Sequence, residues 1–180
     1  MSTVHPYPAL ARRVIEARLK GGPTPGPKDF QALSADLALW TPQHGCFVSI
    51  KNKDGSLRGC IGTFIPTQKS LGAEIMANAV SAAVRDPRFP PLRPDELDTV
   101  RISVDVLSEP ELVRPGMALD AKIYGVIVAK EGQRGLLLPD LEGVSSVEQQ
   151  LAIAAQKAGI ESLDGAEIYR FTVSRYKEGA

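Results

Sequence analysis

The chain has 180 residues, of which 43% are hydrophobic and 23% charged, a composition typical of a single globular domain. Lys and Arg number 21 and so do Asp and Glu, so the net charge is zero. Bulk nucleic-acid binding, which depends on neutralising phosphates, is therefore not expected. The sequence has neither a membrane-length apolar run nor the apolar core of a signal peptide, so we expect a cytoplasmic protein without membrane association.

The first elements along the chain are predicted to be helical. Apolar residues recur at helical spacing over residues 8–20, and the Gly- and Pro-rich residues 21–28 then favour a loop. A second, short helix is predicted over residues 29–40.

A hairpin is predicted next, with strands at 46–50 and 56–64 joined by the turn Asp54-Gly55. Its register places residue 48 or 49 opposite Cys60. Thr67 is the expected N-cap of a helix that runs to about residue 85.

The second half of the chain is predicted to contain further strands and one helix. Alternating apolar residues predict a strand over 100–107, and either Ser146 with Gln149 or Ser145 with Glu148 resembles a capping box at the start of a helix. The remaining predictions are a loop over 108–121, a hairpin with strands at 123–129 and 135–138, and a last strand over 168–173. Strand pairs joined by tight turns indicate an α+β fold, mostly an antiparallel sheet flanked by helices.

The segment Leu57-Arg58-Gly59-Cys60-Ile61-Gly62 is the densest candidate site. Strand alternation predicts that Leu57 and Ile61 share one face, with Arg58 and Cys60 roughly 7 Å apart on the other. A glycine inside a strand indicates close approach of a backbone or of a ligand. Cys60 is either a modestly reactive thiol, whose thiolate form the charge of Arg58 favours, or a small, packed hydrophobic side chain.

Asp86 and Arg88 form a second candidate site. A carboxylate at a helix C-terminus is disfavoured by the dipole, so Asp86 is expected either to have a specific cationic partner or to start an Asp-Pro turn. The candidate partners are Arg58, Arg85 and Arg88.

One stripe of the helix predicted after Thr67 is polar. It contains Glu74, Asn78, Ser81 and Arg85, and it either lines a cleft or is a solvated face.

The remaining candidates do not predict a metal site or a cofactor. The chain has only two cysteines and two histidines, with no CxxC pair and too few ligands at sensible spacing for a structural zinc site, and it has no glycine-rich phosphate motif. A dyad of His44 with Cys60 is disfavoured because His44 lies further along the hairpin, and both Cys46 and Cys60 are expected to be free thiols.

The segment 57–62 followed by Asp86-Pro87-Arg88-Phe89-Pro90-Pro91 resembles the AMMECR domain family, whose prokaryotic members are also called AmmeMemoRadiSam system protein A. The resemblance implies one domain over residues 8–178, preceded by a tail at 1–7, with a larger and a smaller subdomain around a cleft. It also implies association with a Memo-like protein and a radical S-adenosylmethionine protein. It carries over no catalytic residue.

The sequence thus predicts a binding module whose surface includes Arg58, Gly59, Gly62, Asp86 and Arg88. The expected ligand is a protein partner, a specific RNA or an anionic ligand. The alternative is a thiol-dependent enzyme with Cys60 as nucleophile or redox residue.

Overall fold

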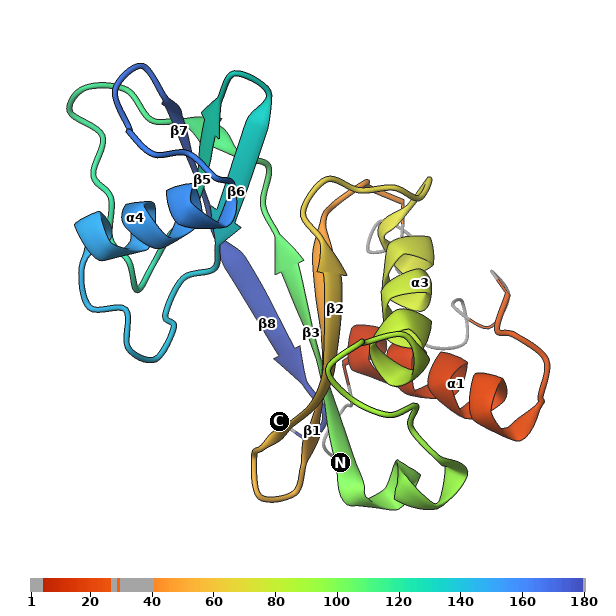
Figure 1. Ribbon diagram of the computed structural model, residues 1–180. Helices are drawn as coiled ribbons and strands as arrows, with labels where there is room; N and C mark the ends of the chain where they lie inside the picture. Colours follow the sequence, from red (N-terminus) through yellow and green to blue (C-terminus); the bar gives the residue numbers. More distant parts are fainter. Residues whose placement is uncertain (1–4, 27–28, 30–40, 180) are drawn as a thin grey trace. The chain divides into compact units, whose positions relative to one another are not determined.

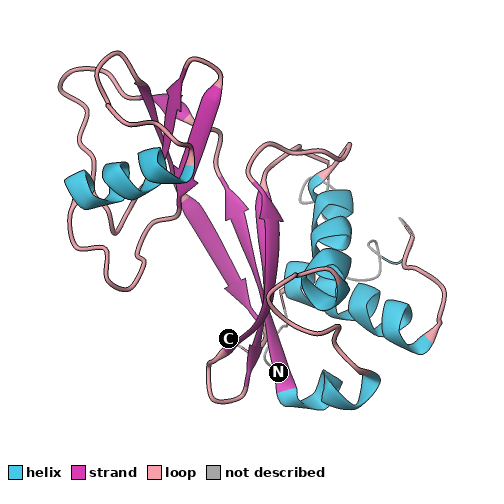
Figure 2. Ribbon diagram, in the orientation of Figure 1, coloured by secondary structure: helices cyan, strands magenta, loops and turns pink. Residues whose placement is uncertain are grey.

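The chain folds into helices and antiparallel strands (Figure 2). The computed structural model describes residues 5–26, 29 and 41–179. Two compact units form, one from residues 1–106 with 174–180 and the other from residues 107–173. Each unit contains a four-stranded sheet, so the predicted α+β class is confirmed. None of the described helices is both long enough and apolar enough to cross a membrane.

The first unit consists of a sheet with helices on one face (Figure 1). In sheet order its strands are β2 (Leu57–Thr63), β1 (Cys46–Asn52), β3 (Val100–Leu107) and β8 (Val173–Lys177). Its helices are α1 (Pro6–Lys20), α3 (Leu71–Val84) and the short 3-10 helix η2 (Pro94–Thr99). The predicted hairpin and the strand over 100–107 are confirmed. Neither β8 nor η2 was predicted.

Strand alternation separates the two faces of this sheet. The inward side chains of β1 and β3, such as Val48, Ile50 and Val104, are fully buried. They pack with apolar residues of α1 and α3, such as Leu10 and Ile75. The opposite, outer face carries polar side chains such as Ser49 and Ser103. Within this unit, the described chain places no helix over that outer face.

Helix α3 begins later than predicted, because its N-cap is Ser70 and not Thr67. Thr67 instead donates its backbone N–H to Glu74 Oε2 at 2.8 Å, and Gln68 donates its N–H to the same oxygen at 2.7 Å. The Thr63 hydroxyl donates to the other carboxylate oxygen. The loop therefore wraps around a buried carboxylate before the helix can start.

The polar stripe of α3 is not a solvated face at its first two positions. Glu74 is fully buried and Asn78 is 4% exposed. The Asn78 side chain donates to the Cys46 carbonyl at 3.0 Å and to the Thr63 hydroxyl at 3.1 Å. These two residues join α3 to the ends of β1 and β2, because buried polar groups need such partners.

The second unit packs one helix on its own sheet. Its strands, in sheet order, are β4 (Glu111–Leu112), β7 (Glu167–Phe171), β5 (Gly125–Lys130) and β6 (Gln133–Leu137), and its helix is α4 (Val147–Lys157). The predicted β5–β6 hairpin and the Ser146 N-cap are confirmed. A Cβ on Gly135 would lie 1.8 Å from the Ala154 carbonyl oxygen, so glycine lets α4 approach β6 closely. β4 was not predicted, and the helix predicted over 29–40 lies outside the described residues.

We expect Glu74→Gln to lower the free energy of unfolding at pH 7 by about 2 kcal/mol, since an amide NH₂ would face backbone donors. Burial raises the pKa of Glu74, but hydrogen bonds from Thr63, Gln68 and Thr67 outweigh it and the pKa is lowered. A carboxylate whose pKa is lower in the folded than in the unfolded state stabilises the fold above the unfolded pKa, which is about 4.3 for Glu. This contribution is lost as the pH falls below that value.

Urea denaturation at pH 7 and below pH 4 measures the difference in the free energy of unfolding between Glu74→Gln and the wild type. This difference should shrink at the lower pH. Glu142→Gln, at an exposed position, is the matched control and should change little at either pH. Equal effects of the two substitutions would contradict the role assigned to Glu74.

Candidate functional site

A β-bulge at Arg58 sets the geometry of the candidate site. Ser49 lies opposite Cys60, as predicted, and Ile50 lies opposite Gly59, but Lys51 pairs with Leu57, so Arg58 has no partner on β1. A bulge re-aims the side chains beside it. Leu57 pairs with Lys51 and Ile61 pairs with Val48, which lie on opposite faces of β1. The prediction that Leu57 and Ile61 share one face is therefore wrong, and Leu57 is 37% exposed.

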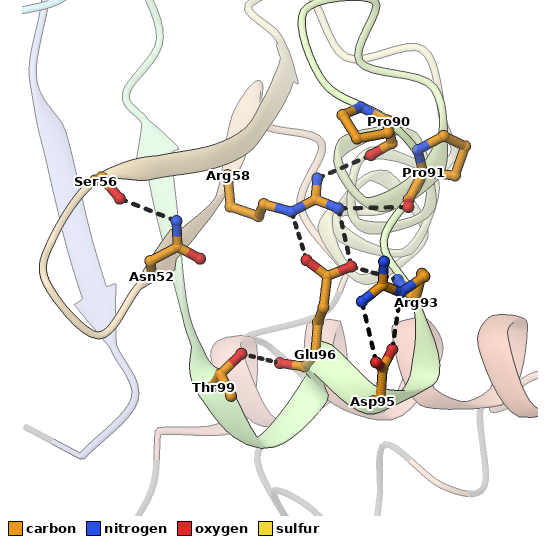
Figure 3. Close-up of polar contacts among 9 residues, drawn as sticks. All are labelled: Asn52, Ser56, Arg58, Pro90, Pro91, Arg93, Asp95, Glu96 and Thr99. Carbon is orange, nitrogen blue, oxygen red and sulfur yellow. Dashed lines mark hydrogen bonds and ion pairs between the residues drawn. The ribbon is translucent and has the colours of Figure 1, made fainter.

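The Arg58 side chain is fully engaged with residues that follow α3 (Figure 3). Its Nε and Nη2 donate to the Glu96 carboxylate at 2.8 and 3.0 Å, and its Nη1 donates to the Pro90 carbonyl at 2.9 Å. The hydrogen bonds from Arg58 lower the pKa of Glu96. Arg58 thus ties β2 to the segment that leads into η2.

The two glycines of the segment are explained by close approach of the chain itself. A Cβ on Gly59 would lie 2.2 Å from the Ala82 carbonyl oxygen, and one on Gly62 would lie 2.2 Å from the Phe47 ring. Of the two alternatives left open by the sequence, a backbone or a ligand, the structure shows packing within the protein at both positions. Gly59 lets α3 lie directly on β2.

Asp86 and Arg88 satisfy the backbone of β2, which is the edge strand of its sheet. The Cys60 N–H donates to Asp86 Oδ2 at 2.9 Å, and the Cys60 carbonyl accepts from Arg88 Nη2 at 3.0 Å. Arg88 also donates to both Asp86 oxygens, at 2.9 and 2.7 Å. Of the three arginines considered for Asp86, Arg88 is the partner, and its hydrogen bonds lower the pKa of Asp86.

This pair replaces a neighbouring strand at one residue, Cys60. Unpaired edge groups are a ready template for pairing with another chain, and a charged pair over them blocks that pairing. Asp86 is 4% exposed, whereas the Arg88 side chain is 56% exposed. The pair therefore fixes the position of Cys60 while leaving the arginine partly open to solvent.

The Cys60 side chain lies on the outer face, in a row of small polar side chains that crosses three strands. Its Sγ lies 3.1 Å from the Ser49 hydroxyl, and Ser49 faces Ser103 on β3. Among the described residues, the Ser49 hydroxyl is the hydrogen-bond partner of the thiol. Cys60 is partly buried.

Cys46 is a different kind of thiol. It is fully buried on the helix-covered face, and burial raises its pKa to about 12, so it stays protonated at neutral pH. Both cysteines are free. In the described part of the chain, no group of three or more His, Cys, Asp and Glu side chains is placed to hold a metal ion.

A polar hollow of about 340 Å³ opens beside this row on the same outer face. Its lining includes Ser49 and Ser103 together with four cationic side chains: Lys51, Arg101, Arg175 and Lys177. Sequence reasoning missed it, although the outward positions of the 100–107 strand were predicted, because half of the cations lie on the unpredicted β8.

We expect Asp86→Asn to lower the free energy of unfolding by about 2 kcal/mol, because it removes charge-assisted hydrogen bonds from a buried carboxylate. Hydrogen exchange at the Cys60 amide should accelerate in the same variant. Asp95→Asn, which removes an exposed ion pair with Arg93, is the matched control and should leave both quantities unchanged. Unchanged exchange at Cys60 in Asp86→Asn would contradict the edge-capping role.

Gly59→Ala should destabilise the protein by about 1–3 kcal/mol, since the new methyl group meets backbone that cannot move away alone. Gly22→Ala is the control, because a Cβ there makes only ordinary contacts of 3.7 Å. Thermal unfolding of the two variants measures the difference, and equal melting temperatures would count against the packing role of Gly59.

Comparison with known proteins confirms the family that the sequence resembles. The model of the AMMECR1 family matches residues 8–176. A Thermotoga maritima protein is 54% identical over 96% of this chain and 98% of its own length, and a Methanosarcina acetivorans protein is 38% identical over 94% and 88%. The crystal structure of the uncharacterized protein PH0010 from Pyrococcus horikoshii matches with a TM-score of 0.81 and 31% identity, over 98% of this chain and 92% of that one. Since these matches span almost the whole sequence, the chain belongs to the AMMECR1 family.

Proposed function

We propose that this protein is a binding module for an anionic ligand, and that its recognition surface is the outer face of the sheet β2-β1-β3-β8. The observation that carries the proposal is the composition of that face. The polar row Cys60–Ser49–Ser103 adjoins a hollow lined by four cationic side chains, on a face that the described helices of its unit leave uncovered.

The site residues predicted from the sequence hold the strand β2 in place, at the edge of this surface and on the opposite face of the sheet. Asp86 and Arg88 hold the Cys60 peptide, and Arg58 anchors β2 through Glu96. Gly59 and Gly62 are contacts within the protein. In this proposal these residues position Cys60, and only the half-exposed Arg88 is itself open to a ligand at the edge of the surface.

The alternative of a thiol-dependent enzyme rests on the partial exposure of Cys60 and on its contact with Ser49. A nucleophilic cysteine needs a base or a cation beside it to form the thiolate. Ser49 offers a hydroxyl, which is neither. The Arg58 guanidinium is committed to Glu96 and to proline carbonyls, and Arg88, beside Cys60, is paired with Asp86 and donates to the Cys60 carbonyl. The contacts of Cys60 therefore favour binding over thiol chemistry.

The rate of Cys60 alkylation by iodoacetamide at pH 6.5 separates the two functions. For a binding module we expect folded protein to react at Cys60 no faster than free N-acetylcysteine, since Ser49 is not a base and the charge of Arg88 is offset by its ion pair with Asp86. Peptide mass spectrometry follows each cysteine, and Cys46 reports unfolding because it is buried. Reaction at Cys60 more than about tenfold faster than the free thiol would overturn the proposal in favour of the enzyme.

A further inference from the structure

We infer that the hollow on the outer face binds the phosphate group of a small phosphorylated ligand, through Lys51, Arg101 and Lys177. This inference rests on the proposed function and names the class of ligand that the surface recognises. It moves the anion site away from Arg58 and Arg88, which the chain engages internally.

The first argument is an unfavourable pair of charges. Lys51 on β1 lies directly opposite Arg101 on β3 in the antiparallel register. Like charges at directly opposed positions destabilise a sheet, because their side chains are close neighbours. A local rule broken without a structural gain is a mark of a functional site, and an anion seated between the two side chains removes the repulsion.

The second argument comes from the countercharges around the hollow. Arg175 forms a bidentate pair with Asp105, at 2.7 Å for both contacts. Glu178 is the acidic side chain in the lining, and it is paired with Arg12 and accepts the Ile102 N–H at 2.8 Å.

Lys51, Arg101 and Lys177 remain. Among the described residues no carboxylate lies within ion-pair distance of any of the three. The hollow therefore presents three positive charges that the described part of the chain does not neutralise.

The third argument is the fit of the other groups to phosphate. Ser49 and Ser103 face each other across β1 and β3 within the lining, so two hydroxyl donors adjoin the cations. A phosphate offers several acceptor oxygens and binds both point charges and hydroxyls. At about 340 Å³ the hollow has the size of a small-molecule site, and the chain as a whole has no net charge to attract a long polyanion.

Isothermal titration calorimetry with inorganic pyrophosphate tests the inference on the full-length protein. We expect one pyrophosphate per chain, with affinity that falls at least tenfold in Lys51→Gln and in Arg101→Gln. Lys122→Gln removes the same charge from an exposed position outside the hollow and should bind like the wild type.

Thermal unfolding provides a second readout that a merely structural role would not give. Because Lys51→Gln relieves the like-charge pair, its melting temperature without ligand should equal or exceed that of the wild type. Lost affinity combined with unimpaired stability supports the inference. A large loss of stability in Lys51→Gln would contradict it, because the lysine would then be a structural residue.

Two further outcomes would overturn the inference. One is binding of sulfate, at equal ionic strength, as tight as that of pyrophosphate, which would indicate an unspecific cationic surface. The other is binding of a short single-stranded RNA that tightens with its length and exceeds pyrophosphate, which would indicate a nucleic-acid surface. Calorimetry measures whether the cations of the hollow bind phosphate, and alkylation measures the reactivity of the Cys60 thiol. The phosphate inference can therefore fail while the proposed binding function is still supported.

Discussion

An edge strand must find partners for backbone groups that no neighbouring strand can satisfy, and the way β2 meets this need organises the candidate site. Asp86 and Arg88 bind the backbone N–H and the carbonyl of one residue, Cys60, and the Asp86 carboxylate is almost fully buried. A buried charge is tolerated only when it is paired and hydrogen-bonded. The edge of the sheet, the end of α3 and the position of Cys60 therefore depend on one ion pair.

A similar principle explains Glu74. This carboxylate is fully buried without a salt bridge and relies on backbone and hydroxyl donors from the loop between β2 and α3. Asp86 closes the other end of the same helix through an arginine. Both ends of α3 are thus joined to β2 by acidic side chains, and the small residues between them allow helix and strand to touch.

The fold class and most of the elements could be predicted because their signals are local. The Asp54-Gly55 turn predicted the hairpin and placed residue 48 or 49 opposite Cys60, of which Ser49 is the observed partner. A capping box at Ser146 or Ser145 predicted a helix start, and the observed N-cap is Ser146. The bulge at Arg58 could not be predicted, since it depends on partners that lie more than thirty residues along the chain. The N-cap at Ser70 was missed for a related reason, because Glu74 competes for Thr67.

The sequence predicted which residues belong to the candidate site, but not which partners their side chains contact. Strand alternation alone placed Arg58 and Cys60 on the same face of the strand, whereas the Arg58 guanidinium binds Glu96. The glycines indicated close approach of a backbone or of a ligand, and the structure shows helix and ring packed against them. The hollow was missed because β8 has no alternating apolar pattern, and its cations gain meaning only once it is placed beside β3.

The position of β8 has a consequence for how the protein is made. The chain leaves the first unit after residue 106, builds the second unit, and returns at residue 174 to add the last strand to the first sheet. On a growing chain, that sheet therefore has only three of its strands until β8 emerges from the ribosome. Arg175 and Lys177 arrive with β8, and Glu178, the partner of Arg12, follows it directly. The hollow can therefore assemble only once β8 has joined the other three strands.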